Sequence, residues 1–367
     1  MFMTTPTPST EDLSVTTETV ENRLRRVVAV HFHPAWGTAY WLDRARSLGI
    51  DARRDLRTLE DLRLLGEMTP ADLRRRPLLD YVPRRLHERL DQLVVAQTGG
   101  STRGGGTWTA YREDEFVEAF VLPFLVAAGA VGFPPREQWL FVGPSGPHVI
   151  GKVIRHLAAA FGSPEPFAVD FDPRWAKKLP AQSFAHQRYL GHVIEQAMLV
   201  IDTQEVGVLF TTPPVLDAFA RHMSPAQRAR VRAVHYGGLP IAPEEMLRYQ
   251  GEAFPSAIHL SGYGNTLFGC AMELSTSAGR EIDYFPFGPR LLFDTVCDDG
   301  SLAAAGDTGQ VRFTRLDETM LLVRMRERDH ALLLDAPAAA PAEFVLPGLR
   351  NPRTPVDEAA QLSTGLY

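Results

Sequence analysis

Apolar residues recur at helical spacing in the first quarter of the chain and as short blocks after it. From Val20 to Leu90 the leucines repeat at helical intervals, and Thr69 supplies an N-cap before Pro70 at the first helical position. From Leu93 to about Phe219, and on to residue 261, apolar runs of strand length alternate with helical patterns. The predicted strands are 93–96, 138–143, 167–171, 206–211, 231–236 and 257–261, and the predicted helices are 113–130, 152–161, 184–201, 215–222 and 243–249. This order predicts an α/β fold with a mixed, mainly parallel sheet flanked by helices.

The pattern changes after Gly279. Residues 285–296, 308–316 and 320–325 alternate in polarity and are separated by DDG, GDTG and LDE turns, which predicts antiparallel strands of a second, smaller sheet. We therefore expect a disordered N-terminus (1–18), a helical lead-in (19–92), an α/β core (93–279), a β subdomain (280–330) and a short tail (331–367).

Composition narrows the class of protein. The chain has 367 residues, 45% of them apolar and 22% charged, as expected of a globular protein with a proper core. A net charge of −6 disfavours nucleic acid or an anionic membrane as the main partner. Cys270 and Cys297 cannot form a disulfide framework, and the N-terminus lacks a signal pattern, so we expect a cytoplasmic protein. The longest apolar run, 119–133, is shorter than a membrane span and predicts a buried helix.

Candidate chemistry begins in the stretch QTGGSTRGGGTWT at 97–109. It lies between a predicted strand and a predicted helix, where glycines let backbone N–H groups converge on an anion. Thr98, Ser101 and Thr102 offer hydroxyl donors, and Arg103 offers a fixed positive charge. The alternative is an ordinary glycine-rich surface loop. Neither the P-loop pattern nor the dinucleotide-binding pattern occurs here.

Three further loops follow predicted strands with comparable chemistry. They are GPSGPH at 143–148, GGLPI at 237–241 and GYGNTLFG at 262–269. Loops at the carboxyl ends of strands in an open α/β sheet line the ligand crevice, so we expect these segments to share one site.

These segments, in this order, resemble the adenylate-forming (acyl-adenylate) enzyme superfamily, and within it the phenylacetate–CoA ligase type. The resemblance runs from about Leu48 to Asp329. TGGSTRGGGT resembles the family's Thr/Ser/Gly-rich phosphate loop, and TTPPVL at 211–216 resembles the segment before the substrate pocket. GGLPIAPEE at 237–245 resembles the segment beside adenine, GYGNTLFG resembles the Y-G-x-T-E segment, and MRERD at 325–329 resembles the Y-R-T-G-D segment.

The resemblance implies ATP and Mg²⁺ as cofactors and assigns roles to single residues. Arg103, Thr266 and His148 would be catalytic, with Thr266 on the α-phosphate and His148 (or Phe141) near the substrate carboxylate. The nucleotide would contact Thr98, Gly99, Gly100, Ser101, Thr102, Gly237, Gly238, Leu239, Pro240, Tyr263, Gly264, Asn265, Asp329 and Arg326. The acid would contact Phe141, Pro144, His148, Tyr236, Gly262 and Phe268. Without the resemblance, His148 alone reads as a structural histidine.

The sequence also departs from the family pattern. Leu267 stands where the family has a glutamate that helps hold Mg²⁺, so the metal would rest on phosphates, water or another carboxylate such as Glu273. Gly99 and Arg103 replace the usual Ser and Gly, and Arg103 is a candidate for the missing cation. We expect the family's mobile C-terminal lid domain to be absent, because residues 330–367 are few and contain no lysine.

The leading hypothesis is ATP-dependent activation of a carboxylic acid, aryl or otherwise planar, to an acyl-adenylate. The acyl group would pass to a thiol of CoA or a carrier protein, or to an amine or hydroxyl acceptor, and a homodimer is implied by the resemblance alone. An acyl-protein synthetase of the bioluminescence type is an alternative, ranked lower because the last cysteine, Cys297, lies far from the C-terminus. A degenerate homologue that binds nucleotide or a partner protein without catalysis is the third reading.

Overall fold

The computed structural model describes residues 18–99, 105–176, 178–180, 183–275 and 281–355. The N-terminal helical layer is confirmed. It consists of α1 (Val20–His31), α2 (Ala39–Leu48), α3 (Ala52–Asp55), η1 (Glu60–Leu65), α4 (Pro70–Arg74), η2 (Leu78–Tyr81) and η3 (Arg84–Gln92). The expected cap of α4 is present, because the Thr69 hydroxyl accepts from the Asp72 N–H and the Asp72 carboxylate accepts from the Thr69 N–H.

The glycine-rich loop connects two antiparallel strands. β1 (Leu93–Gln97) pairs with β2 (Trp108–Arg112) in a separate two-stranded sheet. The sequence analysis predicted β1 but missed β2, and it expected the loop to lead directly into a helix. The helix begins one strand later, as α5 (Glu113–Phe116), η4 (Val117–Val121) and α6 (Leu122–Ala130), and it is largely buried as predicted.

The large sheet has eleven strands within the described residues, in the order β10-β11-β12-β13-β9-β8-β7-β6-β5-β3-β4. Its parallel part matches the prediction closely. The elements from β3 to β7 are β3 (Gln138–Gly143), α7 (Val149–Ala160), β4 (Phe167–Asp170), α8 (Pro173–Ala176), α9 (Phe184–Thr203), β5 (Val206–Thr211), α10 (Pro213–His222), α11 (Pro225–Arg230), β6 (Ala233–Tyr236), α12 (Pro243–Arg248), η5 (Tyr249–Ala253) and β7 (Ile258–Asn265). β4, β3, β5, β6 and β7 pair in parallel.

The antiparallel part differs from the prediction in three ways. It consists of β8 (Gly269–Met272), β9 (Asp283–Pro286), β10 (Leu291–Val296), β11 (Thr308–Leu316), β12 (Leu321–Leu334) and β13 (Gly348–Arg353). The strand expected at 285–296 is two strands that do not pair with each other. β12 continues past residue 331 and β13 follows it, so the segment expected to be a tail contributes strands. β13 pairs with β9, and the expected second sheet is thereby continuous with the first.

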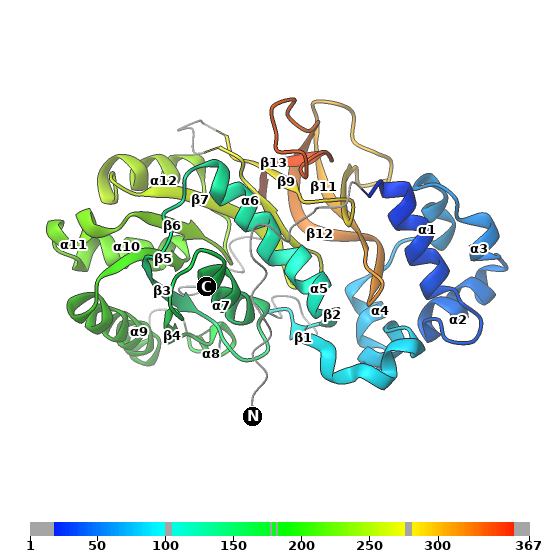
Figure 1. Cartoon of the computed structure of the whole chain (residues 1–367), viewed down its shortest axis with the longest axis horizontal. Coiled ribbons are helices and arrows are strands. Elements are labelled where there is room, and N and C mark those ends of the chain that lie inside the picture. The colour runs from blue at the N-terminus through cyan, green and yellow to red at the C-terminus, as the bar shows by residue number, and fades with distance from the viewer. Residues whose placement is uncertain (1–17, 100–104, 177, 181–182, 276–280, 356–367) are drawn as a thin grey trace.

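Two apolar cores lie on the two faces of the sheet. One joins the α5–α7 side to strand residues such as Trp139, Val208 and Phe285. The other joins α9, α10 and the helical layer to residues such as Val234 and Phe313. Figure 1 shows the helical layer (blue) at one end of the molecule and α9–α12 at the other, with β11–β13 (orange to red) between them. No helix among the described residues is long and apolar enough to span a membrane.

Candidate functional site

The glycine-rich loop is closed at its base by a pair of threonines. The Thr98 N–H donates to the Thr107 carbonyl at 2.9 Å, and the Thr107 N–H donates to the Thr98 hydroxyl at 2.9 Å. Gly106 must be glycine, because a Cβ there would lie 2.5 Å from the Thr98 carbonyl oxygen. The Thr98 hydroxyl is thus already an acceptor for the loop itself. Gly100, Ser101, Thr102 and Arg103 lie outside the described residues.

A second loop, residues 144–148, is attached to this base. The Gln97 N–H at the end of β1 donates to the Pro147 carbonyl at 2.8 Å. Pro144 and His148 are buried, whereas Ser145 and Gly146 are exposed. The structure therefore places the predicted substrate residues Pro144 and His148 beside the predicted phosphate loop.

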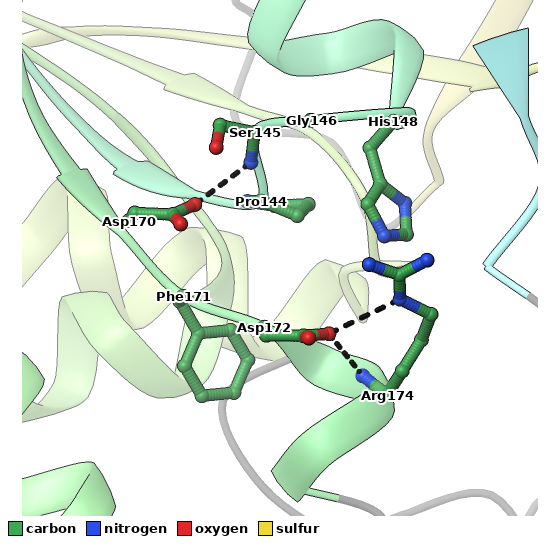
Figure 2. Close-up of a pocket in the computed structure, with 8 residues that line it drawn as sticks. All are labelled: Pro144, Ser145, Gly146, His148, Asp170, Phe171, Asp172 and Arg174. Atoms are coloured by element: carbon green, nitrogen blue, oxygen red, sulfur yellow. Dashed lines mark hydrogen bonds and ion pairs between the residues drawn. The ribbon is translucent and has the colours of Figure 1, made fainter.

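A small pocket of about 100 Å³ opens between this loop and the end of β4 (Figure 2). Eight residues line it: Pro144, Ser145, Gly146, His148, Asp170, Phe171, Asp172 and Arg174. The sequence analysis named two of them and missed the acidic and basic residues at the end of β4. The signal was present, because the strand is followed by the polar segment DFDPR at 170–174.

Phe141 and Tyr236 do not line this pocket. Phe141 is buried in the apolar core, with its ring centroid 5.5 Å from that of Phe210. Tyr236 is buried on the other face of the sheet, where its hydroxyl lies 2.5 Å from Nδ1 of His259. Both side chains are core residues in this structure, contrary to the expectation that they face the acid.

The GGLPI segment leaves the end of β6 in a tight turn. A Cβ on Gly237 would lie 2.8 Å from the Phe210 ring and 3.2 Å from Ile150, so only glycine fits at this point. Gly238 has φ +88°, which also favours glycine. Gly238 and Pro240 are exposed and Leu239 is half-buried. The side chains of Phe210 and Ile150 therefore fill the space beside Gly237 on this face of the sheet.

The GYGNTLFG segment is a β-hairpin and not a loop. β7 continues to Asn265, residues 266–268 make the turn, and β8 begins at Gly269. Two glycines permit the tight pairing: a Cβ on Gly262 would lie 2.9 Å from Cys270 Sγ, and one on Gly264 would lie 2.3 Å from the Gly269 carbonyl oxygen. The side-chain oxygen of Asn265 accepts from the N–H groups of Leu267 and Phe268 and shapes the turn.

All three carbonyl groups of the hairpin turn accept hydrogen bonds from buried side chains. The Tyr111 hydroxyl donates to Thr266 at 2.9 Å, Arg315 to Leu267 at 3.0 Å, and Arg290 to Phe268 at 2.7 Å. We call these three donors the hairpin clamp. Arg315 also donates to the hydroxyl of Thr109 and the carbonyl of Ala110, both in β2. The clamp therefore ties the hairpin to the strand that follows the glycine-rich loop.

The positions of Leu267, Phe268 and Glu273 bear on the expected contacts with the substrate and the metal. Leu267 is buried in the apolar core, and it offers no oxygen ligand in its side chain. Phe268 is fully buried against Phe293 and Phe313, so it packs in the core and does not face a substrate. Glu273 is also far from the turn, because it lies beside Ser261 at the other end of the hairpin. These positions give no support to Phe268 as a substrate contact or to Glu273 as a replacement metal ligand at the turn, and both stay predictions.

The hairpin meets β12 through two carboxylates. The Tyr263 hydroxyl donates to Asp329 at 3.0 Å, and the Thr354 hydroxyl donates to the other carboxylate oxygen at 2.6 Å. Asn265 Nδ2 donates to Glu327 at 2.6 Å. Burial and the nearby negative charge of Asp329 raise the pKa of Glu327 to about 7, although the Asn265 hydrogen bond opposes the shift. Sequence reasoning predicted Tyr263, Asn265 and Asp329 and missed Glu327.

Arg326 lies outside this group. Its Nε donates to Glu67 at 2.8 Å, and Glu67 also receives Arg312. Side chains alternate along a strand, so Arg326 contacts the helical layer while Glu327 and Asp329 contact the hairpin. Arg326 is thus paired with the helical layer in this structure, and its contact with the nucleotide stays a prediction.

Comparison with known proteins gives a structural match only. Neither a protein-family model nor a curated protein sequence matches the chain. The structure is similar to 2-hydroxyisobutyryl-CoA ligase in its postadenylation state with R3-HIB-AMP, with a TM-score of 0.66 and 14% identity over 92% of this chain and 67% of that one. The same ligase in an open conformation with 2-HIB-AMP and CoA gives 0.64 and 14% over 90% and 72%. In the thioesterification state it gives 0.63 and 15% over 91% and 66%.

The match confirms the predicted fold class. It does not identify the substrate or the site residues. The chain spans about two thirds of the length of these ligase chains. Sequence identity this low shows a shared fold and does not transfer substrates or site residues.

Proposed function

We propose, from the fold of an adenylate-forming ligase, that this protein uses ATP to activate a carboxylic acid as an acyl-adenylate. The acyl group then passes to a thiol, as in CoA or a carrier protein, or to an amine or hydroxyl acceptor. The observation that carries the proposal is the contact between two separately predicted nucleotide segments: Tyr263 in the hairpin bonds Asp329 in β12.

Asp329 is suited to hold the ribose. A carboxylate has about four lone-pair positions, and Tyr263 and Thr354 occupy only two of them. The two hydroxyl donors fix the orientation of the carboxylate, so the remaining lone pairs are preorganised for the two ribose hydroxyls. Thr266 lies in the turn next to this pair, with its backbone held by the Tyr111 hydroxyl.

The residues that the structure describes do not form a preorganised binding site for Mg²⁺. No group of three His, Cys, Asp or Glu side chains that could hold a metal ion occurs among the described residues. The carboxylates joined to the hairpin, Glu327 and Asp329, already accept hydrogen bonds. We therefore assign no residue as a metal ligand, and the proposal rests on the nucleotide contacts.

Exchange of pyrophosphate into ATP, measured across a panel of aryl and aliphatic acids, tests the proposal. We expect exchange that depends on one class of acid, because acyl-adenylate formation is reversible before acyl transfer. Absence of exchange with every acid, while ATP still binds, would overturn the activation step. That result would favour the second candidate, a nucleotide-binding homologue without catalysis, for which the buried Leu267 is the supporting observation.

The nucleotide site has its own test. Asp329→Asn should weaken ATP binding by about tenfold or more, because loss of the ionised acceptor weakens the bonds to ribose by roughly 1.4 kcal/mol or more. Asp307→Asn, an exposed aspartate before β11, is the matched control and should bind ATP as the wild type does. Equal ATP affinities for the two variants, measured by calorimetry, would remove Asp329 from the site.

A further inference from the structure

The pocket between the ends of β3 and β4 has opposite charges on its two sides. Figure 2 shows Asp170 on one side, with the His148 ring and the Arg174 guanidinium group together on the other. Asp172 lies next to Arg174 at the floor of the pocket. β3 and β4 pair in parallel, with Gly143 opposite Asp170, so both sides of the pocket are built by neighbouring strand ends.

Arg174 provides the cationic side. Its Nε donates to Asp172 at 3.2 Å, and its two terminal nitrogens make no hydrogen bond to any residue that the structure describes. Its side chain is 44% exposed and is directed toward the buried His148 ring in Figure 2. The planar fork of a guanidinium group can bind a carboxylate through two parallel hydrogen bonds.

Asp170 provides the acidic side, whereas Asp172 lies beside Arg174 and pairs with it. One oxygen of Asp170 accepts the Ser145 N–H at 2.9 Å, and one oxygen of Asp172 accepts the Arg174 N–H at 2.9 Å. Each carboxylate is therefore held by a backbone group through one oxygen, and its second oxygen has no hydrogen bond among the described residues. Burial would raise the pKa of Asp172, but the hydrogen bonds from Arg174 outweigh it and lower the pKa, which keeps the group ionised.

We propose that this pocket binds a small zwitterion of the α-amino acid type, with its carboxylate at Arg174 and its ammonium group at Asp170. A volume of about 100 Å³ suits a small amino acid. A phosphate dianion would meet two carboxylates, and a divalent cation would meet the guanidinium group. Only a ligand with both charges satisfies both sides.

The role of this ligand rests on the proposed function, in which an amine is one of the acceptors. The loop that lines the pocket is bonded to the base of the glycine-rich loop through Gln97 and Pro147, so an amine bound here lies on the side of the sheet where that loop is attached. In the transfer step the amine nitrogen forms a C–N bond to the acyl carbon and the C–O bond to AMP breaks. AMP leaves with the electron pair, two of the three protons of the ammonium group go to solvent, and the third stays on the amide nitrogen.

Binding is tested with L-alanine and with its two halves. Propionate lacks the ammonium group and ethylamine lacks the carboxylate. Ligand-observed NMR titration of the full chain, without ATP, should give L-alanine an affinity at least tenfold higher than that of either half. Three results would each overturn the proposal. They are equal affinities for L-alanine and propionate, no binding of L-alanine, and displacement of ethylamine by Mg²⁺ with no L-alanine binding.

Single substitutions assign the two ends of the ligand. Arg174→Gln should weaken L-alanine binding about tenfold and leave ethylamine unchanged. Asp170→Asn should weaken L-alanine and ethylamine and leave propionate unchanged. Arg188→Gln on α9, where the arginine is 62% exposed and paired with Glu195, is the control for removal of a surface charge. Circular dichroism and thermal unfolding of each variant confirm that it is folded.

The two proposals fail in different ways. If L-alanine binds and the substitutions act as expected, but no acid supports pyrophosphate exchange, the zwitterion pocket stands and the activation step is overturned. Exchange that persists without any binding of L-alanine keeps the activation step and overturns the pocket.

Discussion

Glu273 shows at the scale of one residue how burial controls chemistry. It lies at the end of β8, where one carboxylate oxygen accepts the Ser261 N–H at 3.1 Å. The Ser261 hydroxyl lies 2.7 Å from that of Tyr284, so the carboxyl group belongs to a buried polar cluster. Burial raises the pKa of Glu273 to about 8; the Ser261 hydrogen bond lowers it, and the negative charge of Asp283 raises it further.

This shift predicts a pH dependence of stability. The folded state holds the proton up to about pH 8, whereas the unfolded state releases it near the ordinary glutamate value of about 4.3. The folded state therefore binds more protons between these values, and the free energy of unfolding should fall as pH rises through this window. Glu273→Gln should abolish that part of the fall, which is on the order of a few kcal/mol because one pKa unit corresponds to about 1.4 kcal/mol.

Urea unfolding of both proteins between pH 5 and pH 8.5 measures the difference. The wild type should lose stability relative to the variant as pH rises. Glu252→Gln, which changes an exposed glutamate, should follow the wild type at every pH. Parallel curves for the wild type and Glu273→Gln would show that the carboxyl group titrates normally.

Some residues of the candidate site could be named from the sequence and others could not, and burial is part of the reason. Tyr263, Asn265 and Asp329 could be named as candidates because they lie in segments with a recognisable order of residue types. Phe141 and Tyr236 were misassigned because β3 and β6 are buried on both faces, and a continuously apolar strand does not reveal which side chains face which side. Arg174 was missed because its role depends on β3 and β4 being neighbours.

The hairpin clamp is the feature that connects elements. Tyr111 comes from β2, Arg290 from the segment before β10, and Arg315 from β11, yet all three donate to one turn of three residues. Tyr111→Phe removes one donor and leaves the buried carbonyl of Thr266 without its partner, which costs about 1–3 kcal/mol. The turn should open more often, and the hairpin amides should exchange faster with solvent.

Hydrogen exchange of peptides that cover residues 262–272 measures this opening. Tyr81→Phe is the matched control, because the Tyr81 hydroxyl also donates to a backbone carbonyl, that of Asp72, in the helical layer. We expect faster exchange of the hairpin and weaker ATP-dependent turnover in Tyr111→Phe alone. If Tyr81→Phe speeds hairpin exchange equally, the effect is global instability and not a local clamp.

Helices and strands were predicted well where the local sequence determines them. They were predicted poorly where they form only by pairing with other strands. β3 and β5 have the predicted bounds because each is a continuous apolar run bounded by turn residues. β13 was missed because Gly348–Arg353 contains a proline and no alternation, and it forms only because β12 and β9 are available on either side. The GYGNTLFG hairpin was predicted as a loop because glycine usually marks a turn, whereas here it permits close strands.

A buried ion network joins the helical layer to the antiparallel strands of the sheet. Asp317, in the turn between β11 and β12, is fully buried and receives Arg290, Arg315 and Arg23. Burial would raise the pKa of Asp317, but the three arginines outweigh it and hold the pKa well below its usual range. Arg23 comes from α1 and also pairs with Glu118 in η4 at 2.8 Å. The network therefore links the helical layer, the helix after the glycine-rich loop and the antiparallel strands, which no local sequence pattern could show.

The network makes the helical layer and the sheet one cooperative unit, and Arg23→Met tests this at the scale of the whole molecule. The variant removes one of three arginines from the fully buried Asp317 and the cation from the half-buried Glu118, so we expect a loss of about 3–5 kcal/mol of unfolding free energy. Arg188→Met, which breaks the exposed pair with Glu195, should cost less than about 1 kcal/mol. Urea unfolding followed by far-UV circular dichroism and by tryptophan fluorescence should give one shifted transition in Arg23→Met. Trp36 and Trp41 lie in the helical layer and Trp139 lies in the sheet, so two separate transitions would show that the layer unfolds independently and that the network does not unite them.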